Sequence, residues 1–157
     1  MVVSNEININ CEIDSVIKLI KSPRNLEKFH PFCEKNEVKI WNCENSIDYV
    51  HYYSGKIYKR KFLKWNDDGY ILEIFDSVKT ATITWTAKST SNGSVVKIDA
   101  NLILPFKNKY LRKLVFYLYI KFMMRSYLNN VLKGLKYFLE TGIIVKKNHF
   151  GYHSWYS

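Results

Sequence analysis

The sequence predicts an α+β domain in which a curved antiparallel sheet of seven strands wraps around one long C-terminal helix. Residues 3–10 and the segment from about 37 to 104 carry strand patterns, and short turn sequences divide the second segment. After Pro105 the pattern changes to helical spacing that continues for about thirty residues. Only this helix is long enough to cover the apolar face of such a sheet, so the sheet must curve around it.

The N-terminal elements follow from alternation and from the positions of the prolines. Residues 3–10 alternate apolar and polar side chains, as a half-buried strand does. A short helix is expected over Ser15–Lys21, because Asp14 or Ser15 can cap it and Pro23 ends it. A second short helix, 25–29, ends at the following His-Pro pair.

Six strands follow with connections so short that neighbouring strands must be antiparallel. They are expected near 37–43, 46–54, 56–66, 69–77, 79–89 and 94–104. The strand over 79–89 alternates alanine, isoleucine and tryptophan with threonine, which indicates one buried face. Strand 56–66 has apolar residues on both faces, so its register stays open.

The last element is a helix over 108–141. Gly142 is its expected C-cap, because glycine adopts the left-handed conformation that ends helices. At ~1.5 Å per residue this helix would be about 50 Å long and would cross the whole sheet.

The chain has 157 residues, 47% of them hydrophobic, which is the composition of one globular domain. We expect a single domain over 1–142 and an aromatic, basic tail over 143–157. The three cysteines show no CxxC spacing and the N-terminus has no signal-peptide pattern, which favours the cytoplasm. No apolar run approaches the ~20 residues that a membrane-spanning helix needs.

The run S-P-R-N-L-E-K-F-H-P-F, residues 22–32, together with the element order, resembles the START/Bet v 1-like helix-grip superfamily (SRPBCC). This superfamily includes polyketide cyclase/dehydrase-like and lipid-transfer proteins. The resemblance implies the helix-grip fold and a deep apolar cavity between sheet and helix. It also implies a hydrophobic ligand such as a lipid, an isoprenoid or a polyketide-like molecule.

Candidate ligand-binding residues come from the helix and from strands that could face such a cavity. One face of the helix carries Leu114, Tyr117, Lys121, Met124 and Leu128. The strand candidates are Tyr49, His51, Tyr53, Arg60, Leu72, Ile74, Ile83 and Trp85. Ordinary core packing is the alternative for the apolar members, an outward orientation is the alternative for the polar strand residues, and Lys121 could extend to the rim.

Catalysis finds little support, and we predict no catalytic residue, no cofactor and no metal. No Ser/His/Asp or Cys/His set can be assembled, and His30 is explained as a helix terminator before proline. His149 and His153 have the spacing of two ligands of a zinc site, but no cysteine or acidic residue lies nearby to complete it. A binder or carrier is therefore the leading hypothesis. A cyclase/dehydrase-like enzyme that uses Tyr49, His51 and Arg60 in the same cavity is the alternative.

Positive charge is concentrated at the C-terminal end. Residues 105–157 contain ten of the 24 basic residues and one of the 14 acidic residues. The first half of the helix also carries apolar residues on the side that should face solvent, Leu111, Val115, Leu118 and Phe122. They are flanked by Lys107, Lys109, Arg112, Lys113 and Arg125.

Such a segment could dock on an anionic membrane or on a protein partner, or the 143–157 tail could cover it. Self-association as a homodimer is a further alternative. Nucleic-acid binding through the basic segment and the aromatic tail is a weaker alternative.

Overall fold

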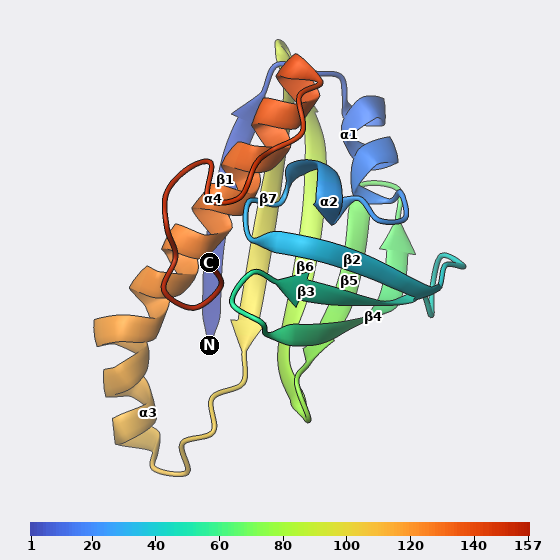
Figure 1. The fold of residues 1–157 in the computed structure, drawn as a ribbon. Coiled ribbons are helices and arrows are strands. Elements are labelled where there is room, and N and C mark those ends of the chain that lie inside the picture. Colours follow the sequence, from blue (N-terminus) through green and yellow to red (C-terminus); the bar gives the residue numbers. More distant parts are fainter.

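The computed structural model describes residues 1–157 as one antiparallel sheet with helices on its concave side (Figure 1). The strands are β1 (Val2–Ile9), β2 (Cys33–Ile40), β3 (Ile47–Tyr52), β4 (Ile57–Asn66), β5 (Gly69–Phe75), β6 (Lys79–Thr90) and β7 (Gly93–Leu102). The helices are α1 (Ile13–Ile20), α2 (Leu26–Phe29), α3 (Lys109–Val115), the π-helical turn η1 (Phe116–Ile120) and α4 (Lys121–Thr141). The sheet order is β1-β7-β6-β5-β4-β3-β2, and every neighbouring pair is antiparallel.

The predicted fold class is confirmed, and each predicted strand and helix is present within a few residues of its expected bounds. Two boundaries differ for identifiable reasons. Helix α1 begins at Ile13 with Glu12 as N-cap, and no side chain caps it. Strand β2 begins at Cys33, four residues early, because its inward-facing residue is the polar Asn36, which hides the alternation.

Helix α4 contacts the sheet and α2 through apolar side chains and one glycine. Leu128, Val131, Leu132 and Leu135 are all buried, as expected for a helix that covers an apolar sheet face. A Cβ atom on Gly134 would lie 2.0 Å from the carbonyl oxygen of α2 residue Phe29, so glycine permits the close approach of α4 to α2. At the end of the helix Gly142 adopts φ 71°, which confirms the predicted C-cap.

The predicted helix over 108–141 is interrupted by a π-helical turn. Asn108 caps its start by accepting hydrogen bonds from the N–H groups of Tyr110 and Leu111, at 2.9 and 3.1 Å. The turn η1 inserts one extra residue, which rotates everything before it by ~100° relative to α4. Helix α3 also projects beyond the sheet and has no buried residue (Figure 1). Leu114 and Tyr117 are exposed, and the expectation that they meet the sheet on one face with Met124 and Leu128 is wrong.

A β-bulge resolves the open register of strand β4. Phe62 pairs with Leu72, but the next paired residue is Lys64, opposite Ile71, so one residue of β4 is extra. The bulge changes the phase of the strand, and Phe62 and Trp65 both turn toward the core, with ring centroids 5.7 Å apart. The shift explains why Trp65 faces the core as Phe62 does, whereas Ile57 and Leu63 are exposed.

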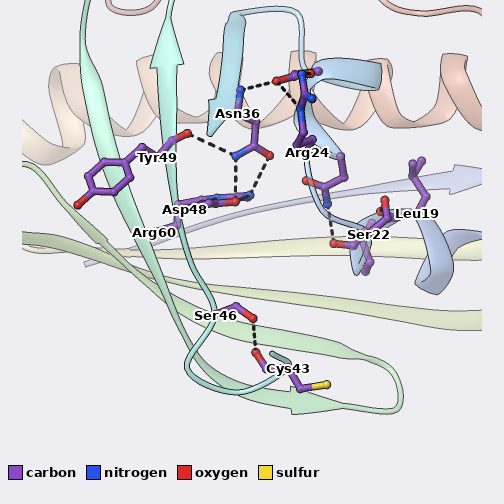
Figure 2. A network of polar contacts seen from close by, with 12 residues as sticks. Leu19, Ser22, Arg24, Asn36, Cys43, Ser46, Asp48, Tyr49 and Arg60 are labelled. Carbon is purple, nitrogen blue, oxygen red and sulfur yellow. Dashed lines mark hydrogen bonds and ion pairs between the residues drawn. The ribbon is translucent and has the colours of Figure 1, made fainter. Parts of the chain in front are cut away.

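A buried ion pair sets the phase of strand β3. Arg60 of β4 pairs across the sheet with Asp48 of β3, and its Nε donates to Asp48 Oδ1 at 2.7 Å. Asn36 of β2 completes the network, because its amide nitrogen donates to Asp48 Oδ2 at 2.9 Å (Figure 2). Since Asp48 points inward, so do Val50 and Tyr52, and the residues between them point outward.

None of the helices combines the length and the hydropathy that a membrane-spanning helix requires.

The ion pair predicts a specific pattern of stability changes. Asp48→Ala should lower the free energy of unfolding by about 3 to 5 kcal/mol, because it leaves the buried Arg60 guanidinium unpaired. Asp48→Leu combined with Arg60→Met should recover most of this loss, since the double change removes both charges and keeps the volume. Urea denaturation measures both. A loss below about 1 kcal/mol for Asp48→Ala would show that the pair behaves as a solvated one.

Candidate functional site

A cavity of about 290 Å³ lies between the sheet and the long helix. Of its 24 lining residues, 20 are hydrophobic. The sheet contributes Val50, Leu72, Ile74, Ala81, Ile83, Trp85, Ile98 and Leu102, and the helix contributes Ile120, Met124, Leu128 and Val131. The wall is therefore made by the inward-facing residues of β3 to β7 and by the inner face of η1 and α4.

Seven of the thirteen candidate residues line this cavity: Arg60, Leu72, Ile74, Ile83, Trp85, Met124 and Leu128. That any of them binds a ligand stays a prediction. The other six do not line it: Tyr49, His51, Tyr53, Leu114, Tyr117 and Lys121. Tyr49 and His51 alternate with the inward-facing residues of β3, and Tyr53 follows its end. Leu114 precedes η1, and Tyr117 lies within it. Lys121 instead lies over the Tyr117 ring, 5.6 Å from its centroid.

His51 takes part in a charge cluster on the outer sheet face. Its Nε2 lies 3.3 Å from Glu37 Oε2, and the same carboxylate is bonded by Lys39 and Lys35. Hydrogen bonds from Lys39 and Lys35 lower the pKa of Glu37 to about 2. Tyr49, His51 and Arg60 therefore do not converge on one point, as an enzyme built on them would require.

Three polar side chains that sequence reasoning missed form a row on the cavity wall. The backbone N–H of Phe32 donates to His30 Nδ1 at 3.2 Å, so the imidazole proton is on Nε2. His30 Nε2 donates to the Tyr127 hydroxyl at 2.9 Å, and this hydroxyl lies 2.8 Å from that of Tyr52. His30, Tyr127 and Tyr52 all line the cavity.

The row has one proton more than it has acceptors. Because His30 donates to Tyr127, the two tyrosines have two hydroxyl protons for a single contact between their oxygens. One proton occupies that contact, and the other has no acceptor within the protein. An oxygen atom of a bound molecule could accept it, so the cavity offers a hydrogen-bond donor in an apolar wall.

Burial keeps this row uncharged. Desolvation, assisted by the nearby Arg60 charge, lowers the pKa of His30 to about 3, so the imidazole is neutral near pH 7. Burial raises the pKa of Tyr52 and of Tyr127 well above the ordinary value for tyrosine, so both stay protonated. All three groups act as neutral hydrogen-bonding partners.

Arg60 contributes no free charge to the cavity. Burial disfavours the charged guanidinium, but attraction and hydrogen bonding by Asp48 outweigh this and raise the pKa of Arg60. The positive charge is thus matched by a carboxylate within hydrogen-bond distance. The other cationic lining residue, Lys56, is exposed to solvent, with its Nζ 5.5 Å from the Tyr156 ring centroid. The buried part of the wall, with a neutral histidine and a paired arginine, favours an uncharged group over an anion.

The C-terminal tail closes one end of the cavity. Trp155 and Tyr156 line it, and the Tyr156 ring centroid lies 4.6 Å from those of both Tyr52 and Tyr127. His153 is buried, stacks on Tyr156 at 5.3 Å and donates from Nε2 to the Met123 carbonyl at 3.0 Å.

Backbone hydrogen bonds hold the start of the tail against the α2–β2 segment. Val145 N–H donates to the Lys28 carbonyl at 3.0 Å, and Asn148 N–H donates to the Pro31 carbonyl at 2.9 Å. The tail is therefore packed against the domain and forms part of the cavity wall.

Some of these missed residues carried a sequence signal. Tyr127 lies three residues after Met124 and four before Val131, so helical spacing alone places it on the same face. The inward position of Tyr52 would have followed from alternation along β3, once Asp48 and Val50 are placed inward. The tail residues had no such signal, because their placement depends on contacts with residues far away in the sequence, from Met123 of the long helix to Lys28 and Pro31 near the N-terminus.

No cluster of three or more histidine, cysteine or acidic side chains is placed to hold a metal ion. His149 and His153, the pair with the spacing of two zinc ligands, make contacts with different partners. His149 packs against Tyr137 with ring centroids 4.7 Å apart, while His153 is bonded to the Met123 carbonyl.

No protein-family model matches the sequence, and no curated protein matches it. Solved structures match the fold. The protein XoxI from Bacillus cereus has a TM-score of 0.68 at 13% identity, with 89% of this chain and 96% of that chain covered. Ara h 8.0201 has a TM-score of 0.68 at 12% identity, covering 90% and 98%. The di-domain ARO/CYC protein StfQ from the steffimycin biosynthetic pathway has a TM-score of 0.69 at 12% identity, covering 88% and 50%.

The chain therefore has the helix-grip fold of Bet v 1-like and cyclase-like proteins, which confirms the resemblance predicted from the sequence. At these identities the likeness shows the fold alone, and function must be argued from the cavity.

The neutral, buried His30 predicts a pH dependence of stability. Unfolded histidine binds a proton near pH 6.5, whereas folded His30 binds one only near pH 3. Between these values the unfolded state holds more protons, so the free energy of unfolding falls as pH drops, by up to ~1.4 kcal/mol per pH unit. The variant His30→Gln should lack this part of the slope, and His149→Gln, at an exposed position, should keep it. Urea denaturation across this range measures the slopes, and equal slopes for wild type and His30→Gln would contradict the assignment.

Proposed function

We propose that the protein binds and carries an uncharged hydrophobic molecule with a hydrogen-bond-accepting oxygen, in the cavity between the sheet and the long helix. A lipid, an isoprenoid or a polyketide-like molecule has this chemistry. The observation that carries the proposal is the unmatched hydroxyl proton of the Tyr52–Tyr127 pair in a mostly apolar cavity, whose buried charge, Arg60, is paired with Asp48. An apolar pocket with few polar groups is typical of small-molecule sites.

The cavity volume supports a small ligand, and the descriptions of two matched structures agree with its proposed chemistry. About 290 Å³ is close to the lower end of the ~300 to 1,000 Å³ range of such sites. StfQ is described as an ARO/CYC protein of a biosynthetic pathway, and another match, DynU16, belongs to the dynemicin biosynthetic locus. These descriptions are compatible with a hydrophobic, oxygen-bearing ligand for this chain.

A cyclase- or dehydrase-type reaction is the second candidate, and the hydrogen-bonded row of His30, Tyr127 and Tyr52 is the observation in its favour. General acid–base catalysis is most effective when the pKa of the group lies near the working pH. Here the pKa of His30 is about 3, and those of the two tyrosines lie far above neutrality. The row is therefore better suited to orienting a ligand than to moving protons.

Filling the cavity should abolish ligand retention. Ala81→Phe places an aromatic ring in the space that the ligand would occupy, and we expect it to lower the amount of co-purified ligand at least tenfold. Thr84→Phe adds the same ring on the outer face of the same strand, and is the matched control. Solvent extraction and native mass spectrometry of the purified proteins provide the measurement. Equal retention by Ala81→Phe and wild type would place the ligand elsewhere, and a wild-type protein that binds no hydrophobic probe would overturn the proposal.

The hydroxyl pair predicts a non-additive pattern. Tyr52→Phe and Tyr127→Phe each leave one hydroxyl with a free proton, so each should have little effect on binding. The double variant removes both hydroxyls but leaves the Nε2–H of His30 without its acceptor on the same wall. Only the triple variant Tyr52→Phe, Tyr127→Phe, His30→Leu removes every donor of the row, so it should weaken binding of a long-chain ketone about fivefold, as expected for one lost hydrogen bond, while the matching alkane is unaffected.

Displacement of a fluorescent hydrophobic probe measures these affinities. Tyr70→Phe is the control, because the Tyr70 hydroxyl is buried without a partner and does not line the cavity. Equal losses for the ketone and the alkane would mean that packing, and not the hydroxyl donor, determines binding.

A further inference from the structure

The α3–η1 segment presents an exposed apolar surface. Between 46% and 84% of each exposed apolar or aromatic side chain is accessible, and these residues are Tyr110, Leu111, Leu114, Tyr117, Leu118 and Tyr119, together with Phe122 at the start of α4. Helix α3 has no buried residue, and it projects beyond the sheet in Figure 1. Val115, expected to belong to this surface, is half-buried. A contiguous group of exposed large apolar residues in a soluble domain marks an interaction site.

The tail does not cover this surface. It runs instead over the cavity, and its contact with the segment is made by Trp155, whose indole N–H donates to the Tyr119 hydroxyl at 3.3 Å. Leu118 and Phe122 stay exposed beside this contact. The intramolecular alternative that the sequence left open is therefore not realised.

The charge around the surface has one sign. Six basic residues lie within or next to the segment: Lys107, Lys109, Arg112, Lys113, Lys121 and Arg125. The sequence has no acidic residue between Asp99 and Glu140, and none of the six takes part in an ion pair. Their positive charge is thus available to an external anionic partner.

We propose that the α3–η1 segment docks the protein on an anionic lipid bilayer, with Leu118 and Phe122 inserted among the lipids and the flanking lysines and arginines on the headgroups. An apolar helix face with a basic border is the pattern that binds such interfaces. A second copy of this chain fits poorly, because a symmetric contact would bring both sets of basic residues together. Leucine side chains at the centre of the surface do not stack on bases, which disfavours RNA.

Vesicle co-sedimentation tests the proposal. Wild-type protein should bind vesicles of phosphatidylcholine with phosphatidylserine, and should bind vesicles of phosphatidylcholine alone at least tenfold more weakly. Two double variants should lose binding to the anionic vesicles at least tenfold: Leu118→Gln with Phe122→Gln, and Lys109→Glu with Lys113→Glu. Each basic residue near an anionic surface contributes about fivefold in affinity.

Matched controls separate this surface from general charge and hydrophobicity. Lys133→Glu with Lys146→Glu makes the same change in net charge at exposed positions outside the segment. Val78→Gln with Ile144→Gln removes two exposed apolar residues elsewhere. Both controls should bind anionic vesicles like wild type, and circular dichroism verifies the fold of every variant.

Four outcomes would overturn the proposal: no difference between the two vesicle types, equal losses in variants and controls, tighter binding of single-stranded RNA than of anionic vesicles, or a concentration-dependent dimer that the Leu118→Gln, Phe122→Gln variant abolishes.

Ligand retention is measured on the same proteins. Because these residues do not line the cavity, the docking variants should keep their ligand, so membrane docking and ligand binding fail or succeed independently.

Discussion

The buried Arg60–Asp48 pair determines which side chains reach the cavity. Removing two charges from water is costly, so the pair forms only where guanidinium and carboxylate meet with good geometry. That requirement fixes which residues of β3 and β4 point inward. The hydrogen bond from Asn36 to Asp48 does the same for β2. A shift of β3 by one residue would bury Tyr49 and His51 and expose Tyr52, which would dismantle the hydroxyl row.

The same burial decides the chemical character of the cavity. In the buried part of the wall, polar groups remain only as a matched ion pair or as neutral donors and acceptors, because an isolated charge there would be too costly, whereas the lining residue Lys56 is exposed to solvent. His30 is therefore neutral, the tyrosines are protonated, and Arg60 is paired. The buried wall thus offers an apolar surface and one hydroxyl donor. Under the proposed function, this donor selects a ligand with an oxygen atom, and the apolar surface sets few further requirements.

The element order was predictable because it rests on local periodicity and turn chemistry. The clean alternation over β6 gave Ile83 and Trp85 their correct face, and helical spacing did the same for Met124 and Leu128. The errors arose where an interaction between distant residues overrides the local pattern. Asp48 is polar yet buried, so hydrophobicity alone assigns β3 the wrong face. One extra residue in η1 rotates Leu114 and Tyr117 out of the predicted stripe, and no composition signal marks that turn.

The π-helical turn also explains how one continuous helix can serve two surfaces. After the turn, α4 directs Met124, Tyr127 and Leu128 into the cavity, while before it the large apolar residues point to solvent. Regular helical spacing already places Leu111, Leu118 and Phe122 opposite the face of Met124 and Leu128, so the turn changes the side on which Leu114 and Tyr117 lie. The turn itself joins the two, since Ile120 lines the cavity and Tyr119 bonds Trp155, another cavity-lining residue. The cavity and the proposed docking surface therefore adjoin along one helix, with Trp155 of the tail in contact with both.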